Sequence, residues 1–490
     1  KNNIKINIPS KVNLAASSLV AFFMAPALMF AENWDDHDRS GRYTALEVAK
    51  NYLNSCDKNA ILFTNGDNDT FPLWYAQEVE GIRTDIKVVN LSLFNTDWYI
   101  DQMKRASYDA QPIPSSLQHE DYRSGTRDYT PIFEKTKDRV DVKQVVQFIN
   151  SNNPNRKIRT SGGLRNYCPT KKLKLEVNFE KKAREYTSNF MKSNKSSSVS
   201  DSIQISQKIY TDTLAYFKSF IPKEYQNKIV SEIRWQLKGN GLYKNKLMVL
   251  DILANFNWER PIYFATTVGQ DNFMGLEKYF QLEGLTYRLV PYIAQSTDRQ
   301  PGVVHTEKMY QRLTKDFVWG GYNNPDTYFD ETNTRMVLNF RNSYSRLAES
   351  LMQKQDTVRA VETLDKCVNE FSSKVVPFSY YAPFMIDIYL RAQQNDKGKN
   401  ILVDMIDRYV DEYKYLKAFA YNSGVNQNER IALQILGNLN QIISIHKLSN
   451  NEFDYIKKDG SYFMQKDDSE EEIDYQTFRI NTFISEFLEL

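Results

Sequence analysis

The sequence predicts an α/β fold, with a Rossmann-like parallel sheet built from βα units, followed by an all-α region and preceded by one transmembrane helix. Three observations carry this prediction. An apolar run comes near the N-terminus, short apolar runs alternate with helical patterns in the first half, and helical periodicity alone continues from about residue 335. A chain of 490 residues exceeds one ordinary domain. We therefore divide the chain into residues 1–31, 32–330 and 331–490.

The apolar run at residues 12–31 contains only one Asn and two Ser as polar residues. A helix of about 20 residues crosses a bilayer core of roughly 30 Å, and Pro26 is tolerated in a spanning helix. Lys residues precede the run and acidic residues follow it, and basic flanks favour the cytoplasmic side. We therefore expect residues 1–31 to hold a cytoplasmic-side flank and a membrane helix, with the rest outside the cytoplasm. A cleaved signal peptide ending near Ala31 is the alternative.

The next segment predicts a helix at residues 43–54 and then a βαβ unit. Residues 60–64 form an apolar run typical of a buried strand, residues 71–80 have a helical pattern that stops at a Gly, and residues 86–93 indicate a second strand. The turn-forming sequence Asn-Gly-Asp-Asn-Asp follows the first strand. Because ligands bind at the carboxyl ends of strands in open α/β sheets, this loop is a candidate site.

A second βα unit is predicted further along the chain. Residues 261–266 resemble the first strand, residues 277–284 resemble the helical segment at 74–81, and residues 285–292 indicate another strand. A helix at residues 246–256 precedes the unit. We therefore expect both units to contribute to one parallel sheet.

Two segments between the units have loop-like compositions. Residues 111–165 are rich in Pro, Asp, Arg and Ser, which predicts long surface loops around a helix at residues 142–149. Residues 188–206 are rich in Ser and Lys, which predicts an exposed linker or lid.

The C-terminal region predicts a tetratricopeptide-like helical domain. Ala348 and Ala360 have the spacing at which one helix of such a repeat packs on the next. Helices are expected at residues 380–393, 397–413 and 428–446. A helical bundle that only braces the α/β domain is the alternative.

Composition excludes some classes of function. The formal net charge is only +2, with 63 Lys and Arg against 61 Asp and Glu. The chain therefore lacks the excess of basic residues that is typical of nucleic-acid-binding proteins. Cys56, Cys168 and Cys367 are isolated in the sequence, so neither a zinc site nor a disulfide framework is expected.

Two groups of side chains follow predicted strands. Asp67, Asn68 and Asp69 could bind a ligand, and Asp67 and Asp69 could hold a divalent cation through hard oxygen ligands. A turn stabilised by Asx hydrogen bonds is the alternative. Trp98 and Tyr99 could stack on a sugar or an acceptor peptide, or they could pack a helix.

A further candidate site lies directly after the apolar run, where it would meet a lipid-linked sugar phosphate and a protein acceptor. His37 could move a proton there, and Arg39 could pair with phosphate. The alternative is a junction that caps the next helix and is anchored at the interface by Trp34. The candidate residues are Trp34, Asp35, Asp36, His37, Asp38 and Arg39.

Several long, irregular strings carry a resemblance to a known family. They are Glu32-Asn-Trp-Asp-Asp-His-Asp-Arg-Ser40, Phe63-Thr-Asn-Gly-Asp-Asn-Asp-Thr-Phe-Pro-Leu-Trp-Tyr75, Glu78-Val-Glu-Gly-Ile-Arg83, Val89-Asn-Leu-Ser92, Thr96-Asp-Trp-Tyr-Ile100 and Arg260-Pro-Ile-Tyr-Phe264. Over roughly residues 20–370 the chain resembles a Bacteroidetes family of multi-span inner-membrane proteins, formerly of unknown function. That family is related to the eukaryotic protein O-mannosyltransferase that modifies receptor ectodomains.

The resemblance implies a glycosyltransferase of the GT-C type in the bacterial inner membrane, with the bulk of this chain in the periplasm. Members carry a catalytic carboxylate in an N-terminal membrane bundle and take sugar from a polyprenyl phosphate donor. We expect this chain to be the C-terminal part of such a protein, to help bind the acceptor protein, and to meet the lipid-linked donor through the missing membrane part. The catalytic residues are unknown. A non-catalytic scaffold for envelope protein partners is the alternative, and a soluble nucleotide- or metal-binding enzyme is a third.

Overall fold

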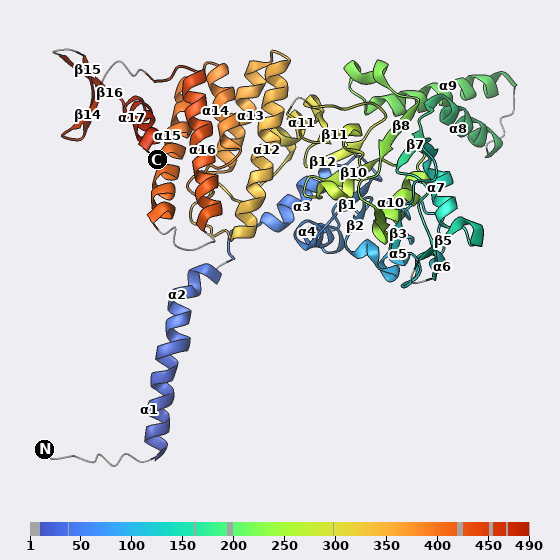
Figure 1. Cartoon of the computed structure of the whole chain (residues 1–490), viewed down its shortest axis with the longest axis horizontal. Coiled ribbons are helices and arrows are strands. Elements are labelled where there is room, and N and C mark those ends of the chain that lie inside the picture. The colour runs from blue at the N-terminus through green and yellow to red at the C-terminus, as the bar shows by residue number, and fades with distance from the viewer. Residues whose placement is uncertain are drawn as a thin grey trace.

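The computed structural model describes residues 10–37, 39–160, 163–193, 199–296, 298–418, 425–449, 454–466 and 469–489. Figure 1 shows a long N-terminal helix that leaves a body made of an α/β part and a stack of helices. One cluster of buried hydrophobic side chains runs from Val48 in the α/β part to Phe483 in the last helix, so the two parts share one core. The predicted α/β class with an additional helical region is confirmed.

The N-terminal helix consists of α1 (Ser10–Phe22), a π-helical turn (Phe23–Ala27) and α2 (Leu28–His37). The wide turn surrounds Pro26, because proline has no N–H to donate and its ring crowds the preceding turn. The segment Lys11–Trp34 is long and apolar enough to cross a membrane, and its most apolar window has no buried residue. The predicted helix is therefore present, and it continues beyond the apolar run to His37.

The main sheet has six strands in the order β13-β11-β12-β10-β1-β2. Its parallel half joins β1 (Ile61–Thr64) to β10 (Ile262–Ala265) on one side and β2 (Lys87–Asn90) on the other. Every residue of these three strands is buried, as expected for a parallel sheet covered on both faces. The first βαβ unit and the alignment of the second strand with the first are confirmed.

The rest of the second βα unit is only partly as expected. The strand predicted at residues 285–292 is present as β12, but it runs antiparallel to β10, so the sheet is mixed rather than all parallel. The expected helix at residues 277–284 is a 3₁₀ turn (Glu277–Tyr279) followed by strand β11 (Phe280–Glu283). This strand pairs antiparallel with β12 (Thr286–Leu289), and β13 (Val303–Val304) pairs parallel with β11. Gly284 turns the hairpin with a φ of +73°, and a Cβ there would lie 2.3 Å from Ser55 Oγ. The apolar periodicity of a fully buried strand resembles that of a helix, which explains the error.

The four helices expected in the α/β part are confirmed. They are α3 (Thr44–Asn54), α4 (Asp67–Glu78), α7 (Val142–Ile149) and α10 (Lys244–Ala254). α3 packs on α4, and α10 packs on α7. The remaining elements here are α5 (Asp97–Met103), α6 (His119–Tyr122), α11 (Thr306–Gln311) and the small sheets β3 (Tyr129–Pro131) with β9 (Gly241–Tyr243), β4 (Val140–Asp141) with β7 (Lys172–Glu176) and β8 (Glu232–Gln236), and β5 (Lys157–Thr160) with β6 (Gly163–Asn166).

The Ser-rich segment at residues 188–206 is mostly helical. It contains the end of α8 (Phe179–Ser193) and the start of α9 (Val199–Ser219), which pack against each other. Residues 194–198 lie outside the described residues. An arm of two helices therefore replaces much of the expected linker or lid (Figure 1).

The C-terminal region is a stack of helices, as the periodicity predicts. The first two are α12 (Glu331–Gln353) and α13 (Thr357–Glu370), followed by α14 (Ala382–Arg391), α15 (Asn395–Ala418) and α16 (Val425–Ile445). An unpredicted three-stranded sheet of β14 (Asp454–Lys458), β15 (Ser461–Lys466) and β16 (Ser469–Ile473) precedes α17 (Tyr475–Glu489).

A buried ion network joins the sheet to the segment that leads into the helical stack. The Glu283 carboxylate is fully buried and lies 3.0 Å from Lys308 Nζ and 3.4 Å from an Arg312 guanidinium nitrogen. Asp57, after α3, lies 3.1 Å from Lys308 Nζ and 3.4 Å from Arg312, and it also pairs with Arg288 of β12. Burial alone would raise the pKa of Glu283, but the three cations hold that pKa well below its ordinary value.

Replacement of Glu283 with Gln is expected to lower the free energy of unfolding by about 3–5 kcal/mol near neutral pH, because surplus positive charge stays buried. Since the folded pKa of Glu283 lies below the ordinary value of 4.5, its stabilisation is present above that pH and is lost as the pH falls. The difference in the free energy of unfolding between the wild type and the Gln variant should therefore become smaller below pH 4.5. Urea unfolding of the detergent-solubilised chain across this pH range measures the effect, and a difference independent of pH would contradict it.

Candidate functional site

The first candidate site lies where β1 ends and α4 begins. Asp69 accepts hydrogen bonds from the backbone N–H groups of Asn65, at 3.1 Å, and Gly66, at 2.9 Å. The Thr267 hydroxyl, from the loop after β10, donates to the same carboxylate at 2.7 Å. Asp69 is only 7% exposed, so its oxygens are used to hold the two loops of the parallel strands together.

The structure corrects the predicted loop at residues 65–69. Asp67, Asn68 and Asp69 form the first turn of α4, where acidic side chains are favoured by the helix dipole. Asp67 and Asn68 are exposed and can reach a ligand, whereas the carboxylate of Asp69 already accepts hydrogen bonds from within the protein. In the part of the chain that the structure describes, no group of three or more His, Cys, Asp or Glu side chains could hold a metal ion. A divalent cation at Asp67 and Asp69 stays a prediction.

A buried asparagine completes this edge of the sheet. The Asn90 amide, at the end of β2, donates to the Gly66 carbonyl at 3.3 Å and to the Thr70 hydroxyl at 3.0 Å. Its oxygen accepts from the backbone N–H groups of Ser92, at 2.8 Å, and Leu93, at 3.1 Å. Sequence reasoning did not select Asn90, although an amide at the end of an otherwise apolar strand is a signal that could have found it.

Aromatic side chains of α4 and α5 form an exposed surface beside Asp67. Phe71 is 49% exposed, Tyr75 is 42% exposed and Trp98 is 55% exposed, whereas Trp74 is half-buried. Trp74 and Trp98 both contact the Tyr99 ring, with ring centroids 6.5 Å and 5.6 Å away. The rings of Phe71 and Trp74 stack at 5.3 Å. We call Phe71, Trp74, Tyr75 and Trp98 the aromatic surface. Sequence reasoning selected only Trp98, and the helical spacing of the other three was the signal it missed.

Tyr99 has a different place from its neighbour Trp98. Its side chain is buried, and its hydroxyl accepts from the Asn90 N–H at 2.9 Å and donates to the Val88 carbonyl at 3.5 Å. Burial raises the pKa of Tyr99 to about 12. The Tyr99 hydroxyl therefore pairs with backbone groups of the edge strand β2. Of the two neighbouring rings, only Trp98 faces solvent.

The residues directly after the apolar run continue the N-terminal helix as far as His37. Trp34 is 62% exposed and packs on Phe30 with ring centroids 4.8 Å apart. Asp35, Asp36 and His37 belong to α2, and the structure does not describe their side chains.

Of the other two junction candidates, Asp38 lies outside the described residues and Arg39 is exposed. Arg42 forms an ion pair with Asp330 at 3.1 Å, just before α3 begins at Thr44. This ion pair links the connection between α2 and α3 to the residue before α12.

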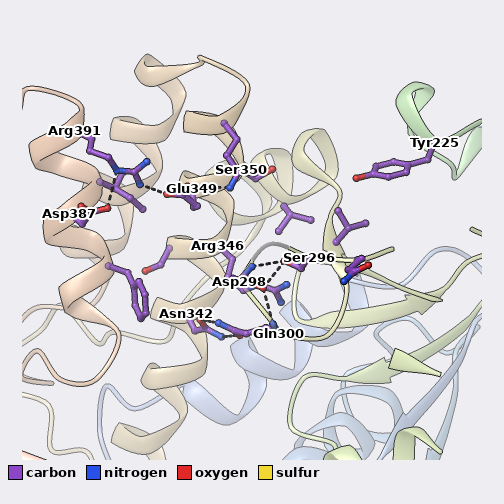
Figure 2. Close-up of a pocket in the computed structure, with 17 residues that line it drawn as sticks. Tyr225, Ser296, Asp298, Gln300, Asn342, Arg346, Glu349, Ser350, Asp387 and Arg391 are labelled. Atoms are coloured by element: carbon purple, nitrogen blue, oxygen red, sulfur yellow. Dashed lines mark hydrogen bonds and ion pairs between the residues drawn. The ribbon is translucent and has the colours of Figure 1, made fainter. Parts of the chain in front are cut away.

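A second candidate site is a cleft of about 660 Å³ between the α/β part and the helical stack. Figure 2 shows Asn342, Arg346 and Glu349 of α12 on one side, facing Asp298 and Gln300 from the segment before β13. Arg346 pairs with Asp298 at 2.6 Å. The cleft joins segments remote in sequence, so no local pattern predicted it.

The wall formed by α14 carries both charge and an exposed ring. Arg391 pairs with Asp387 at 2.9 Å and also with Glu349 (Figure 2). His446, which directly follows α16, hydrogen-bonds the other Asp387 oxygen at 2.8 Å. Phe384 lines the same cleft and is 57% exposed.

Replacement of Asp69 with Ala is expected to lower the free energy of unfolding by about 1–3 kcal/mol, because three donors lose their acceptor. Replacement of the exposed Asp67 with Ala is expected to cost less than about 0.5 kcal/mol. Thermal and urea unfolding of the two variants measures the contrast. Equal losses would show that the Asp69 hydrogen bonds do not stabilise the edge.

The sequence profile of a family described as TMEM260-associated domain 2 matches residues 45–221 and residues 211–309. Together these segments cover residues 45–309, more than half of the 490 residues. They include α3, the six strands of the main sheet and the aromatic surface, whereas α12 and the later helices lie outside them. No curated protein and no solved structure matches the chain.

Proposed function

The chain belongs to the TMEM260-associated domain 2 family, and on this basis we propose that it is the extracytoplasmic C-terminal portion of a membrane protein O-glycosyltransferase. The proposed enzyme is O-mannosyltransferase-like and uses a polyprenyl-phosphate sugar donor bound in its membrane part. This portion helps to bind the acceptor protein.

The observation that carries the proposal is that α4 and α5, which bear the aromatic surface, lie on the side of the body toward which the N-terminal helix extends (Figure 1). The N-terminal helix leads through a short connection into α3, and α4 packs directly on α3. Figure 1 shows α4 and α5 on the lower border of the body, the side toward which the N-terminal helix extends. Aromatic rings stack on sugars and on peptide side chains, and the exposed Asp67 and Asn68 supply hydrogen bonds beside them. An acceptor held there would lie close to the membrane.

The proposed location is the bacterial inner membrane, with the bulk of the chain in the periplasm. Lys11 and the two earlier Lys residues precede the span, and Glu32 with three Asp residues follows it. Basic flanks tend to remain in the cytoplasm, which supports this orientation.

Protease added to intact spheroplasts is therefore expected to digest the region after Glu32, because that region would face outward. Immunoblotting with antibodies to the C-terminal helices measures the loss, and a cytoplasmic marker protein serves as the control. Complete protection of the region after Glu32, in spheroplasts whose outer membrane lets the protease through, would contradict the orientation.

Deletion of the gene is expected to strip O-linked sugar from many envelope proteins, because a transferase acts on a class of acceptors. Strains carrying Phe71→Ala with Trp98→Ala should show the same loss in part, by roughly tenfold if the two rings together contribute about 1.4 kcal/mol to acceptor binding. Glycan staining and mass spectrometry of envelope proteins measure both effects.

The matched control is Val358→Ala, which changes an 80% exposed apolar side chain on α13. It should leave glycosylation and the amount of protein unchanged. Normal glycosylation in the deletion strain would refute the transferase proposal.

The helical stack favours a second candidate function, that of a non-catalytic scaffold for an envelope secretion or assembly complex. Ala348 of α12 and Ala360 of α13 are fully buried, which supports a tetratricopeptide-like hairpin. Such arrays bind partner proteins on their surfaces. Intact glycosylation in the deletion strain, together with stable co-purification of one complex, would favour this function.

A further inference from the structure

The cleft between the sheet and the helical stack lies at the edge strand β13, whereas the aromatic surface lies near β2 at the opposite edge. Its volume of about 660 Å³ is in the range of sites for small ligands. The two surfaces are therefore separate, and a ligand in the cleft has to be inferred from the cleft's own side chains.

The charged side chains of the cleft already have partners within it. Arg346 pairs with Asp298, and it also donates to the Gly302 carbonyl. Arg391 lies between Glu349 and Asp387. A charged ligand would compete with these pairings, and the pairing of Arg346 is costly to break because that side chain is only 3% exposed. The cleft is thus suited to a neutral ligand.

At the lower end of the cleft as Figure 2 shows it, a pair of amides has unused hydrogen-bonding capacity. Gln300 donates to Asn342 at 3.1 Å, and Asn342 donates back to Gln300 at 2.8 Å (Figure 2). Each amide has two N–H groups and two lone pairs, and this pairing uses one of each. Both side chains are half-buried and line the cleft. The remaining donors and acceptors match hydroxyl groups, which both donate and accept.

An apolar contact is available on the neighbouring helix. Phe384 and Ile388 are one helical turn apart on α14, and both line the cleft. The Phe384 ring is 57% exposed, so its surface is open to a ligand. The C–H face of a sugar ring packs on such an aromatic surface while its hydroxyls bond to planar polar side chains.

We propose that this cleft binds a short neutral oligosaccharide. Sugar rings stack on Phe384, and their hydroxyls hydrogen-bond to Gln300 and Asn342. Sugar binding in this cleft does not require that the protein transfers sugar. Intact glycosylation in the deletion strain would therefore contradict the proposed function but not this proposal.

The test uses the full chain in detergent, with mannotriose, maltotriose and chitotriose as probes. Saturation-transfer NMR and isothermal titration calorimetry are expected to detect binding of at least one of them. For that sugar, Phe384→Ala and Asn342→Ala should each weaken binding roughly tenfold, the loss of one stacking contact or one pair of hydrogen bonds. A sialylated trisaccharide of the same length should bind more weakly, because its carboxylate would disturb the ion pairs.

Val358→Ala is the matched control and should leave the affinity unchanged, and thermal unfolding shows that each variant is folded. Because Phe384 is exposed, its replacement is expected to preserve the fold. Absence of binding of all three sugars at concentrations up to about 10 mM would overturn the proposal. Equal binding by the Phe384 variant, or displacement of the sugar by a Ser- and Thr-rich peptide of higher affinity, would also overturn it.

Discussion

The buried ion network around Glu283 is the constraint on which the arrangement of the molecule depends. A buried carboxylate is costly unless its charge and its lone pairs all have partners. Here Lys308 and Arg312 lie on one side, and the Tyr263 hydroxyl donates to Glu283 at 2.9 Å. Gln281 donates to the other carboxylate oxygen. Because these groups come from β10, β11, α11 and the turn that follows it, the compensated charge specifies how α11 lies on the sheet.

That placement determines where the helical stack begins. α11 leads through Trp319 toward α12, and the Asn51 side chain of α3 accepts a hydrogen bond from the Val318 N–H at 3.1 Å and donates to the Val318 carbonyl. The buried Trp319 indole then donates to Tyr344 of α12 at 3.0 Å. The same helix α3 receives the N-terminal helix and supports α4. The short helix α3 therefore connects the N-terminal helix with α4 and with the segment that leads into α12.

Each of the two candidate surfaces places a few exposed side chains on a support that hydrogen bonds or ion pairs hold in place. At the edge of the parallel strands, Asp69 and Asn90 use their polar atoms internally, and the exposed residues Asp67 and Trp98 stand on this rigid support. In the cleft, Arg346 and Arg391 pair with the three carboxylates that line it, and the Phe384 ring stays exposed. In both cases buried hydrogen bonds hold the frame while a few side chains remain free for contact.

The sequence by itself determined the elements whose signal is local. The apolar run, the strands at β1, β2 and β10, and the helices from α12 to α16 follow from periodicity within a few turns or a few residues. The tertiary structure alone decided the hairpin of β11 and β12, since a fully buried strand has no distinct period until its partners are known. It also decided that Asp69 joins two loops and that Tyr99 caps a strand edge. Those roles depend on partners brought near by folding, and hydrogen bonds between residues far apart in the chain leave no pattern in the local sequence.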